Sequence, residues 1–125
     1  MRGNMQAFRH VLKKLTPLEI NIINTKTPYD EPLQIQFDRG FSQEGDCLVC
    51  TITTLVFRES EMNAQEKSFL IRYTLEAVYG CDETDMQEEE LQETITKELY
   101  SYIRLGVTSI IGAAGIDSIS LPYSI

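Results

Sequence analysis

Apolar residues recur at steps of three and four in the last third of the chain, and this spacing predicts a long amphipathic helix. The recurring positions are Leu91, Ile95, Leu99, Ile103, Val107 and Ile110. Polar residues occupy the opposite side, and acidic residues crowd the first turn, where the helix dipole favours them. Gly112 and Gly115 are typical stop signals, so we expect residues 88–125 to form one helix followed by a short extended tail.

Alternation of apolar and polar residues predicts four strands before this helix. We expect them at residues 18–23, 33–38, 47–58 and 69–79, which alternate with a period of two or are rich in β-branched residues. Short connections favour an antiparallel sheet, and one helix after four strands favours an α+β fold with the helix packed on one face. The other face would then expose Gln34, Gln36, Arg72, Thr74 and Glu76.

The pattern of basic and apolar residues in positions 1–17 predicts a separate short helix. Basic side chains lie opposite a set of apolar positions at helical spacing, namely Phe8, Val11, Leu12 and Leu15. The helix would end at Thr16-Pro17, because proline breaks helices. We therefore expect a short basic amphipathic helix over residues 1–17 and a single domain over residues 18–125. The helix would pack on the domain or on a second subunit, with contact to a membrane surface as the alternative.

Charge and hydropathy narrow the class of protein. The formal net charge of -8 argues against binding to nucleic acid, whose phosphates repel an acidic chain. No apolar run is long enough to span a membrane, and the N-terminus lacks the apolar block of a signal peptide, so we expect a cytoplasmic protein without membrane insertion. The acids concentrate in residues 82–98, which we interpret as solvated surface, with a docking face for a basic partner as the alternative.

Candidate catalytic and metal-binding residues are few. Cys47 and Cys50 are three residues apart on a predicted strand, so their sulfurs would point to opposite faces instead of forming a redox pair or a metal knuckle. Cys81 and His10 add no second ligand pair, and the carboxylates show no pairing in a pocket. We expect no enzyme, no catalytic residue, no metal site and no cofactor.

Apolar residues exceed what one small core needs. The predicted strands at 47–58 and 69–79 carry large apolar side chains on both faces, with Leu70 and Val78 opposite the main set. Surplus apolar surface on a soluble chain indicates association with itself or with a partner. A larger core covered by the N-terminal segment is the alternative.

The order of the elements and three segments resemble the SecB family of bacterial export chaperones. The segments are residues 69–79, residues 99–104 and residues 115–122. Within the last two, the matching positions are Leu99, Tyr102, Arg104, Gly115, Ile119 and Leu121. The resemblance implies a four-stranded antiparallel sheet with the long helix packed on it, a homodimer or tetramer, and ATP-independent binding of non-native or extended polypeptides.

The resemblance also implies site residues. Client-binding positions would be Leu70, Val78, Tyr79, Tyr100 and Tyr102. An acidic face that docks a translocase motor would include Glu19, Asp38 and Glu76. The chain departs from the family pattern at Ser101 and Asp117, where the family has proline, and we expect no counterpart of the family's second helix within the 125 residues. The predicted function is that of a SecB-like holdase, in export or for one dedicated partner. The alternative is an oligomeric adaptor or structural protein that has lost general client binding.

Overall fold

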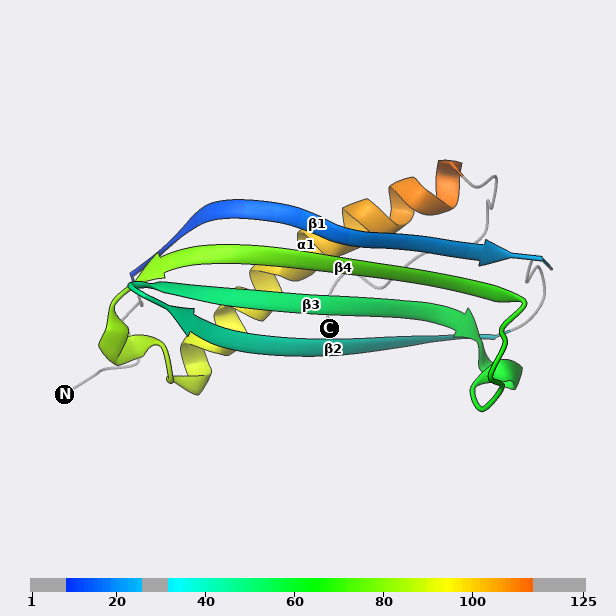
Figure 1. Cartoon of the computed structure of the whole chain (residues 1–125), viewed down its shortest axis with the longest axis horizontal. Helices are drawn as coiled ribbons and strands as arrows, with labels where there is room; N and C mark the ends of the chain where they lie inside the picture. The colour runs from blue at the N-terminus through cyan, green and yellow to red at the C-terminus, as the bar shows by residue number, and fades with distance from the viewer. Residues whose placement is uncertain (1–8, 26–31, 114–125) are drawn as a thin grey trace.

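Four antiparallel strands form one sheet, and a long helix crosses one face of it (Figure 1). The computed structural model describes residues 9–25 and 32–113. The elements are β1 (His10–Asn24), β2 (Leu33–Glu44), β3 (Cys47–Arg58), the 3-10 turn η1 (Glu59–Glu61), β4 (Phe69–Cys81), the 3-10 turn η2 (Glu83–Asp85) and α1 (Glu89–Ala113). This confirms the predicted α+β fold. Among the described residues, none of the helices is long and apolar enough to cross a membrane.

The strands lie in the order β1-β4-β3-β2, so β1 and β2 are the two edges of the sheet. β2 and β3 form a hairpin whose register runs unbroken from Leu33 opposite Arg58 to Glu44 opposite Cys47. The turn between them requires glycine, because Gly45 has a φ of 63°. β4 then pairs with β3 on one side and with β1 on the other.

The core lies between α1 and the apolar face of the sheet. Alternate side chains of the central strands, such as the neighbours Ile52 on β3 and Leu75 on β4, are buried in it. All six positions of the predicted helix stripe are buried as well: Leu91, Ile95, Leu99, Ile103, Val107 and Ile110. Burial of each large apolar side chain contributes about 1.5–3 kcal/mol, so this layer dominates the stability of the fold.

The opposite face of the sheet, called the outer face below, carries no helix in the described part of the chain. The register places the predicted polar set on it: Gln34, Gln36, Arg72, Thr74 and Glu76. Thr51 and Thr53 of β3 lie between them, and Val49 and Leu55 share the same face of that strand. Alternation along the two central strands therefore predicted the side-chain directions correctly.

The expected N-terminal helix is wrong for the residues that the structure describes. From His10 onward the chain is strand, and β1 continues through the expected boundary between residues 17 and 18. Register shifts between Leu12 and Lys14 and between Pro17 and Glu19 each insert one extra residue. As a result, the β1 residues that face α1 are separated by three, two and three positions along the chain. This spacing resembles that of one face of a helix. Residues 1–8, and the predicted tail after α1, lie outside the described residues.

Candidate functional site

Polar contacts fasten the first half of α1 to both edges of the sheet. At the β2 edge, Arg39 donates to Thr96 Oγ1 at 2.7 Å and to Glu93 Oε1 at 2.9 Å. At the β1 edge, His10 Nε2 lies 2.7 Å from Glu98 Oε1. The two edge strands, which are furthest apart in the sheet, are therefore both tied to the helix that covers it.

β2 presents a regular, free edge. All twelve of its residues pair with β3 without a bulge, and among the described residues no strand pairs with its other side. Within the described residues, the backbone groups on that side have no strand partner, which is the condition for pairing with another extended chain. Phe37, on the side that faces α1, is 37% exposed, and its ring meets the Tyr100 ring edge-on at 5.7 Å. Arg39 follows on the same side, lies over the Phe41 ring and interrupts this apolar strip.

The β1 edge is less regular and more apolar. Its first part contains two bulges and Pro17, features that protect a sheet edge from pairing. Its last five residues, 20–24, pair regularly with β4. On the side that faces the helix, Ile20 is 54% exposed, and on α1 Leu105 is 67% exposed. Together with Ile22 and Tyr102, which are also exposed, these residues are called the α1–β1 surface below.

The structure places the five predicted client-binding residues in three different locations. Leu70 and Val78 lie on the outer face, where they pair with Phe57 and Val49 of β3. Tyr100 is buried on α1 beside the β2 edge. The two other tyrosines, Tyr79 and Tyr102, line one hollow between the start of β1 and α1.

This hollow between β1 and α1 has a volume of about 380 Å³ and combines aromatic walls with one carboxylate. Tyr79 donates its hydroxyl hydrogen to Glu98 Oε2 at 3.1 Å, and the His10 ring stacks obliquely on Tyr79 with 5.7 Å between centroids. Burial, followed by the nearby Glu98 carboxylate, raises the pKa of Tyr79. The tyrosine therefore stays protonated and acts as a hydrogen-bond donor that orients Glu98.

The three predicted docking acids all lie on the outer face. Glu19 and Asp38 belong to one cross-strand row, which runs from Glu19 on β1 through Thr74 and Thr53 to Asp38 on β2. Glu76 lies in the adjacent row on β4. Glu19 accepts an ion pair from Arg72 at 2.8 Å, whereas Asp38 is exposed and makes no hydrogen bond or ion pair with any described residue.

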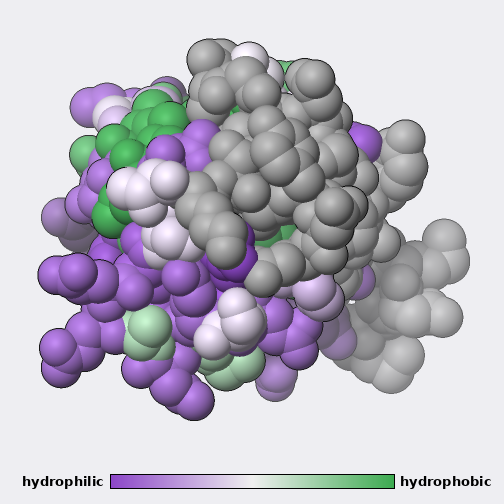
Figure 2. All heavy atoms as spheres, turned by 90° about the vertical axis from the view of Figure 1, so that its right-hand side faces the viewer, coloured by the Kyte–Doolittle hydropathy of each residue, from purple (hydrophilic) through white to green (hydrophobic). Residues whose placement is uncertain are grey.

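A second hollow, of about 740 Å³, opens on the outer face where β1 ends and β4 begins. Its apolar part comes from three neighbouring strands through Ile23, Leu55 and Leu70. Figure 2 views this end of the molecule and shows hydrophobic surface gathered at the upper left, above a mostly hydrophilic surface. The hollow is thus an apolar recess on the outer face, bordered by polar residues of the β3–β4 connection.

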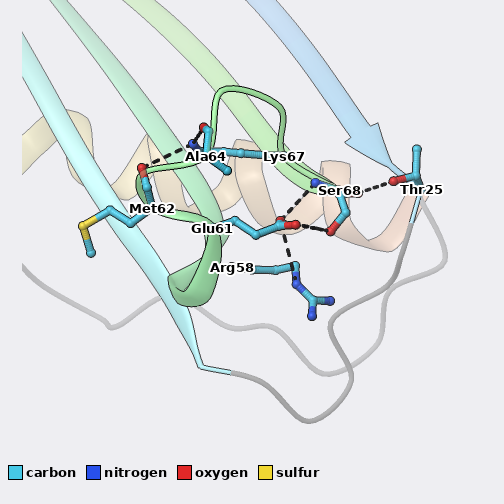
Figure 3. A network of polar contacts seen from close by, with 7 residues as sticks. All are labelled: Thr25, Arg58, Glu61, Met62, Ala64, Lys67 and Ser68. Atoms are coloured by element: carbon cyan, nitrogen blue, oxygen red, sulfur yellow. Dashed lines mark hydrogen bonds and ion pairs between the residues drawn. The ribbon is translucent and has the colours of Figure 1, made fainter.

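A polar network holds the β3–β4 connection beside this hollow (Figure 3). The Glu61 carboxylate accepts hydrogen bonds from the Ser68 backbone N–H at 3.0 Å and from the Ser68 hydroxyl at 2.8 Å. Lys67 Nζ donates to the carbonyl oxygen of Ala64 at 2.9 Å, and Thr25, directly after β1, donates to that of Ser68 at 3.1 Å. Desolvation acts to raise the pKa of Glu61, but the Ser68 hydrogen bonds and the Arg58 charge outweigh it and lower that pKa.

The cysteines lie apart, as the strand geometry predicted. Cys47 is on the outer face, and Cys50 is buried on the side that faces α1. Burial raises the pKa of Cys50 to about 11, and desolvation also raises the pKa of Cys81. Within the described residues there is no group of three or more His, Cys, Asp or Glu side chains placed to hold a metal ion.

Comparison with known proteins finds the same fold in a solved structure. The solved structure of Mycobacterium tuberculosis Rv1957, a SecB-like chaperone in complex with a ChAD peptide from the Rv1956 HigA1 antitoxin, matches with a TM-score of 0.70. The match covers 91% of this chain and 90% of that chain, at 17% sequence identity. No protein-family model and no curated protein matches the sequence. The chain therefore has a SecB-like fold.

Sequence reasoning missed the free β2 edge and the exposed Phe37 beside it. The alternation of Leu33, Ile35 and Phe37 was a clear strand signal. Nothing in that pattern indicated whether the strand lay at the edge or in the middle of the sheet, because strand order depends on pairings between distant segments.

Proposed function

We propose that this protein binds extended or non-native polypeptide segments without ATP, as a chaperone for one dedicated partner or for a wider set of clients. One observation carries the proposal: a SecB-like fold whose β2 edge is unbroken, unpaired within the described residues and flanked by the exposed Phe37 ring. The structural neighbour was solved with a peptide from another protein, which supports the same class of ligand here. We place the protein's action in the cytoplasm.

The segment would bind by strand addition to β2. In this mode, main-chain hydrogen bonds give affinity that does not depend on sequence, and pockets for alternate side chains give specificity. The regular pairing of Leu33–Glu44 with β3 leaves the outward backbone groups evenly spaced. Apolar side chains of the segment on the α1 side would meet Phe37 and the Tyr100 ring beneath it.

Self-association would use the opposite edge. The α1–β1 surface exposes Ile20, Ile22, Tyr102 and Leu105, and such apolar surface on a soluble chain marks an interface. A second copy would cover these residues and pair with residues 20–24, which lack the bulges and the proline of the first part of β1. The two functions would therefore occupy different edges of the same sheet.

The proposal is tested with a reduced and carboxymethylated protein that cannot refold as the client. Light scattering without ATP should show a larger, stable complex with the wild-type protein. Phe37→Ser should weaken that complex, because the segment loses its aromatic contact at the β2 edge. Ile20→Ser is the matched control at the other edge and should leave client binding unchanged.

A defined oligomer that ignores the client would instead support an oligomeric adaptor that has lost client binding. Equal loss of client binding in Ile20→Ser and Phe37→Ser would argue against the β2 edge as the site.

Docking to a translocase motor through Glu19, Asp38 and Glu76 is a separate proposal, supported by their shared position on the outer face. It is tested by binding to such a motor in the absence of client.

A further inference from the structure

The two sides of the β2 edge differ in chemistry. On the side that faces α1, the strand carries mainly apolar side chains: Leu33, Ile35, Phe37 and Phe41. On the outer side it carries polar or acidic ones: Gln34, Gln36, Asp38, Ser42 and Glu44. Side chains directly opposite each other on paired strands share a face and interact, so an added strand would meet each of these environments with alternate residues.

The charge on the two sides also differs. Arg39 is the one cation of β2, and it lies on the α1 side, where Glu93 and Thr96 already bind its guanidinium. On the outer side the charged residues are Asp38 and Glu44, with no cation of β2 beside them. Next to Asp38 on that side lies Gly40, and a Cβ built there would meet no atom within 4 Å. An acid with open space beside it can accept the long side chain of a lysine or arginine.

Asp38 differs in this respect from the other outer-face acids that the sequence singled out. Glu19, at the opposite end of the same cross-strand row, is already paired with Arg72 at 2.8 Å. Glu76 lies on the central strand β4, between Thr16 and Thr51, where an added strand cannot reach the backbone beside it. Asp38 is thus an unpaired acid among the described residues and also lies on a free edge.

We propose that the segment taken by β2 alternates apolar and polar residues, with a lysine or arginine at the polar position that lies against Asp38. The inference rests on the proposed function, because it names the class of segment that the same edge selects. The apolar residues of the segment lie on the α1 side near Phe37, and the polar ones extend the hydrophilic outer face. The contact with Asp38 sets the register of the bound segment.

Three labelled peptides of equal length test the proposal by fluorescence anisotropy with the full-length protein. The first alternates apolar residues with lysine, the second has the same composition with its apolar residues in one block, and the third alternates with glutamate. The alternating lysine peptide should bind most tightly. Asp38→Asn should weaken its binding about two- to fivefold, the range expected for an exposed ion pair, and reduce the dependence on salt.

Glu19→Gln is the matched control, since it removes an acid from the same cross-strand row at the other edge. It should leave peptide binding unchanged, and thermal melts establish that both variants are folded. If the alternating lysine peptide and the peptide with its apolar residues in one block bind equally well, the proposed alternation of the segment is wrong. If Asp38→Asn and Glu19→Gln have equal effects on binding, the proposed role of Asp38 is wrong. Absence of binding by all three peptides and by an unfolded protein client would instead overturn the proposed function itself.

Discussion

Gly106 of α1 lies directly against the ring of Tyr73 on β4. A Cβ placed at Gly106 would come within 2.8 Å of both Cζ and the hydroxyl oxygen of Tyr73, closer than nonbonded atoms approach. Tyr73 is 6% exposed, so its ring has little freedom to move aside. The second half of the helix therefore packs on the sheet at this distance only because residue 106 has no side chain.

We predict that Gly106→Ala destabilises the fold. Overpacking of a filled core costs about 1–3 kcal/mol, which exceeds the gain of up to about 1 kcal/mol from the better helix propensity of alanine. Urea unfolding measures the difference. Gly112→Ala is the control on the same helix, because a Cβ there meets no atom of the described residues within 4 Å, and it should be neutral or stabilising. If both variants gain stability, the close approach at Tyr73 is not a constraint.

At Thr54 we predict a substitution that raises the stability of the fold. It is fully buried on β3, between Phe37 and Tyr73 of the neighbouring strands, and its hydroxyl has no hydrogen-bond partner among the described residues. A buried hydroxyl without a partner costs free energy, so Thr54→Val should raise the free energy of unfolding by about 1 kcal/mol.

The neighbouring residue is the control for Thr54. The Thr53 hydroxyl lies 3.0 Å from the Thr74 hydroxyl on the outer face, so Thr53→Val breaks a hydrogen bond and should lower stability by up to about 1 kcal/mol. Guanidinium unfolding of the two variants compares them directly. A loss of stability in Thr54→Val would show that its hydroxyl does have a partner.

The Glu61 network predicts a dependence of stability on pH. The pKa of Glu61 is lowered in the folded protein relative to about 4.3 in an unfolded chain. The unfolded state therefore binds the proton more readily, so the stabilisation is present above pH of about 4.3 and is lost as the pH falls through the lower folded pKa. Glu61→Gln should be less stable than wild type at neutral pH, and the difference should shrink in acid.

Urea midpoints measured from pH 7 into the acid range, below the ordinary glutamate pKa of about 4.3, test this dependence. Glu59→Gln is the matched control, because Glu59 belongs to the same 3-10 turn and its side chain makes no hydrogen bond or ion pair with any residue that the structure describes. A pH-dependence in Glu61→Gln that equals that of wild type over this range would contradict a role for the Ser68 hydrogen bonds.

We predict that a charge placed on the α1–β1 surface weakens self-association of the protein. Ile20→Lys places a charge on a side chain that is 54% exposed, so the monomer should fold while self-association weakens. Analytical ultracentrifugation over a range of concentrations measures the change. Val11, which is 65% exposed on the outer side of the irregular part of β1, is the control position, and Val11→Lys should leave assembly intact. If the wild-type protein is a monomer at all concentrations, the proposed α1–β1 interface between subunits does not form.

Regular alternation was enough to predict three strands, their faces and the helix stripe. Ile52 and Leu75 had to face the core because each belongs to a period-two set, and the register confirms that they are neighbours. The expected strand at residues 18–23 is part of β1, but the first part of β1 was not predicted, because the bulges at Lys13 and Leu18 each convert a step of two into a step of three. Local spacing cannot distinguish such a strand from a short helix.

The candidate site could be predicted only in part. Tyr100 was expected to contact a client, and it does lie beside the β2 edge, but its neighbour Phe37 is 63 positions away in the sequence. Tyr79 and Leu70 were both expected to contact a client, and the register places them on opposite faces of β4, as the alternation along that strand indicated. Strand order and the crossing of the helix decide which of these side chains meet, and neither is encoded in a local pattern.

Hydrogen exchange of β2 amides tests the central claim most directly. Amide exchange is measured by NMR with and without a saturating concentration of the peptide that alternates apolar residues and lysine. Strand addition predicts new protection at alternate residues of Leu33–Glu44, whose N–H groups point away from β3, and unchanged exchange in residues 20–24 of β1. Protection confined to β1, or an unchanged β2 in the peptide complex, would contradict the account.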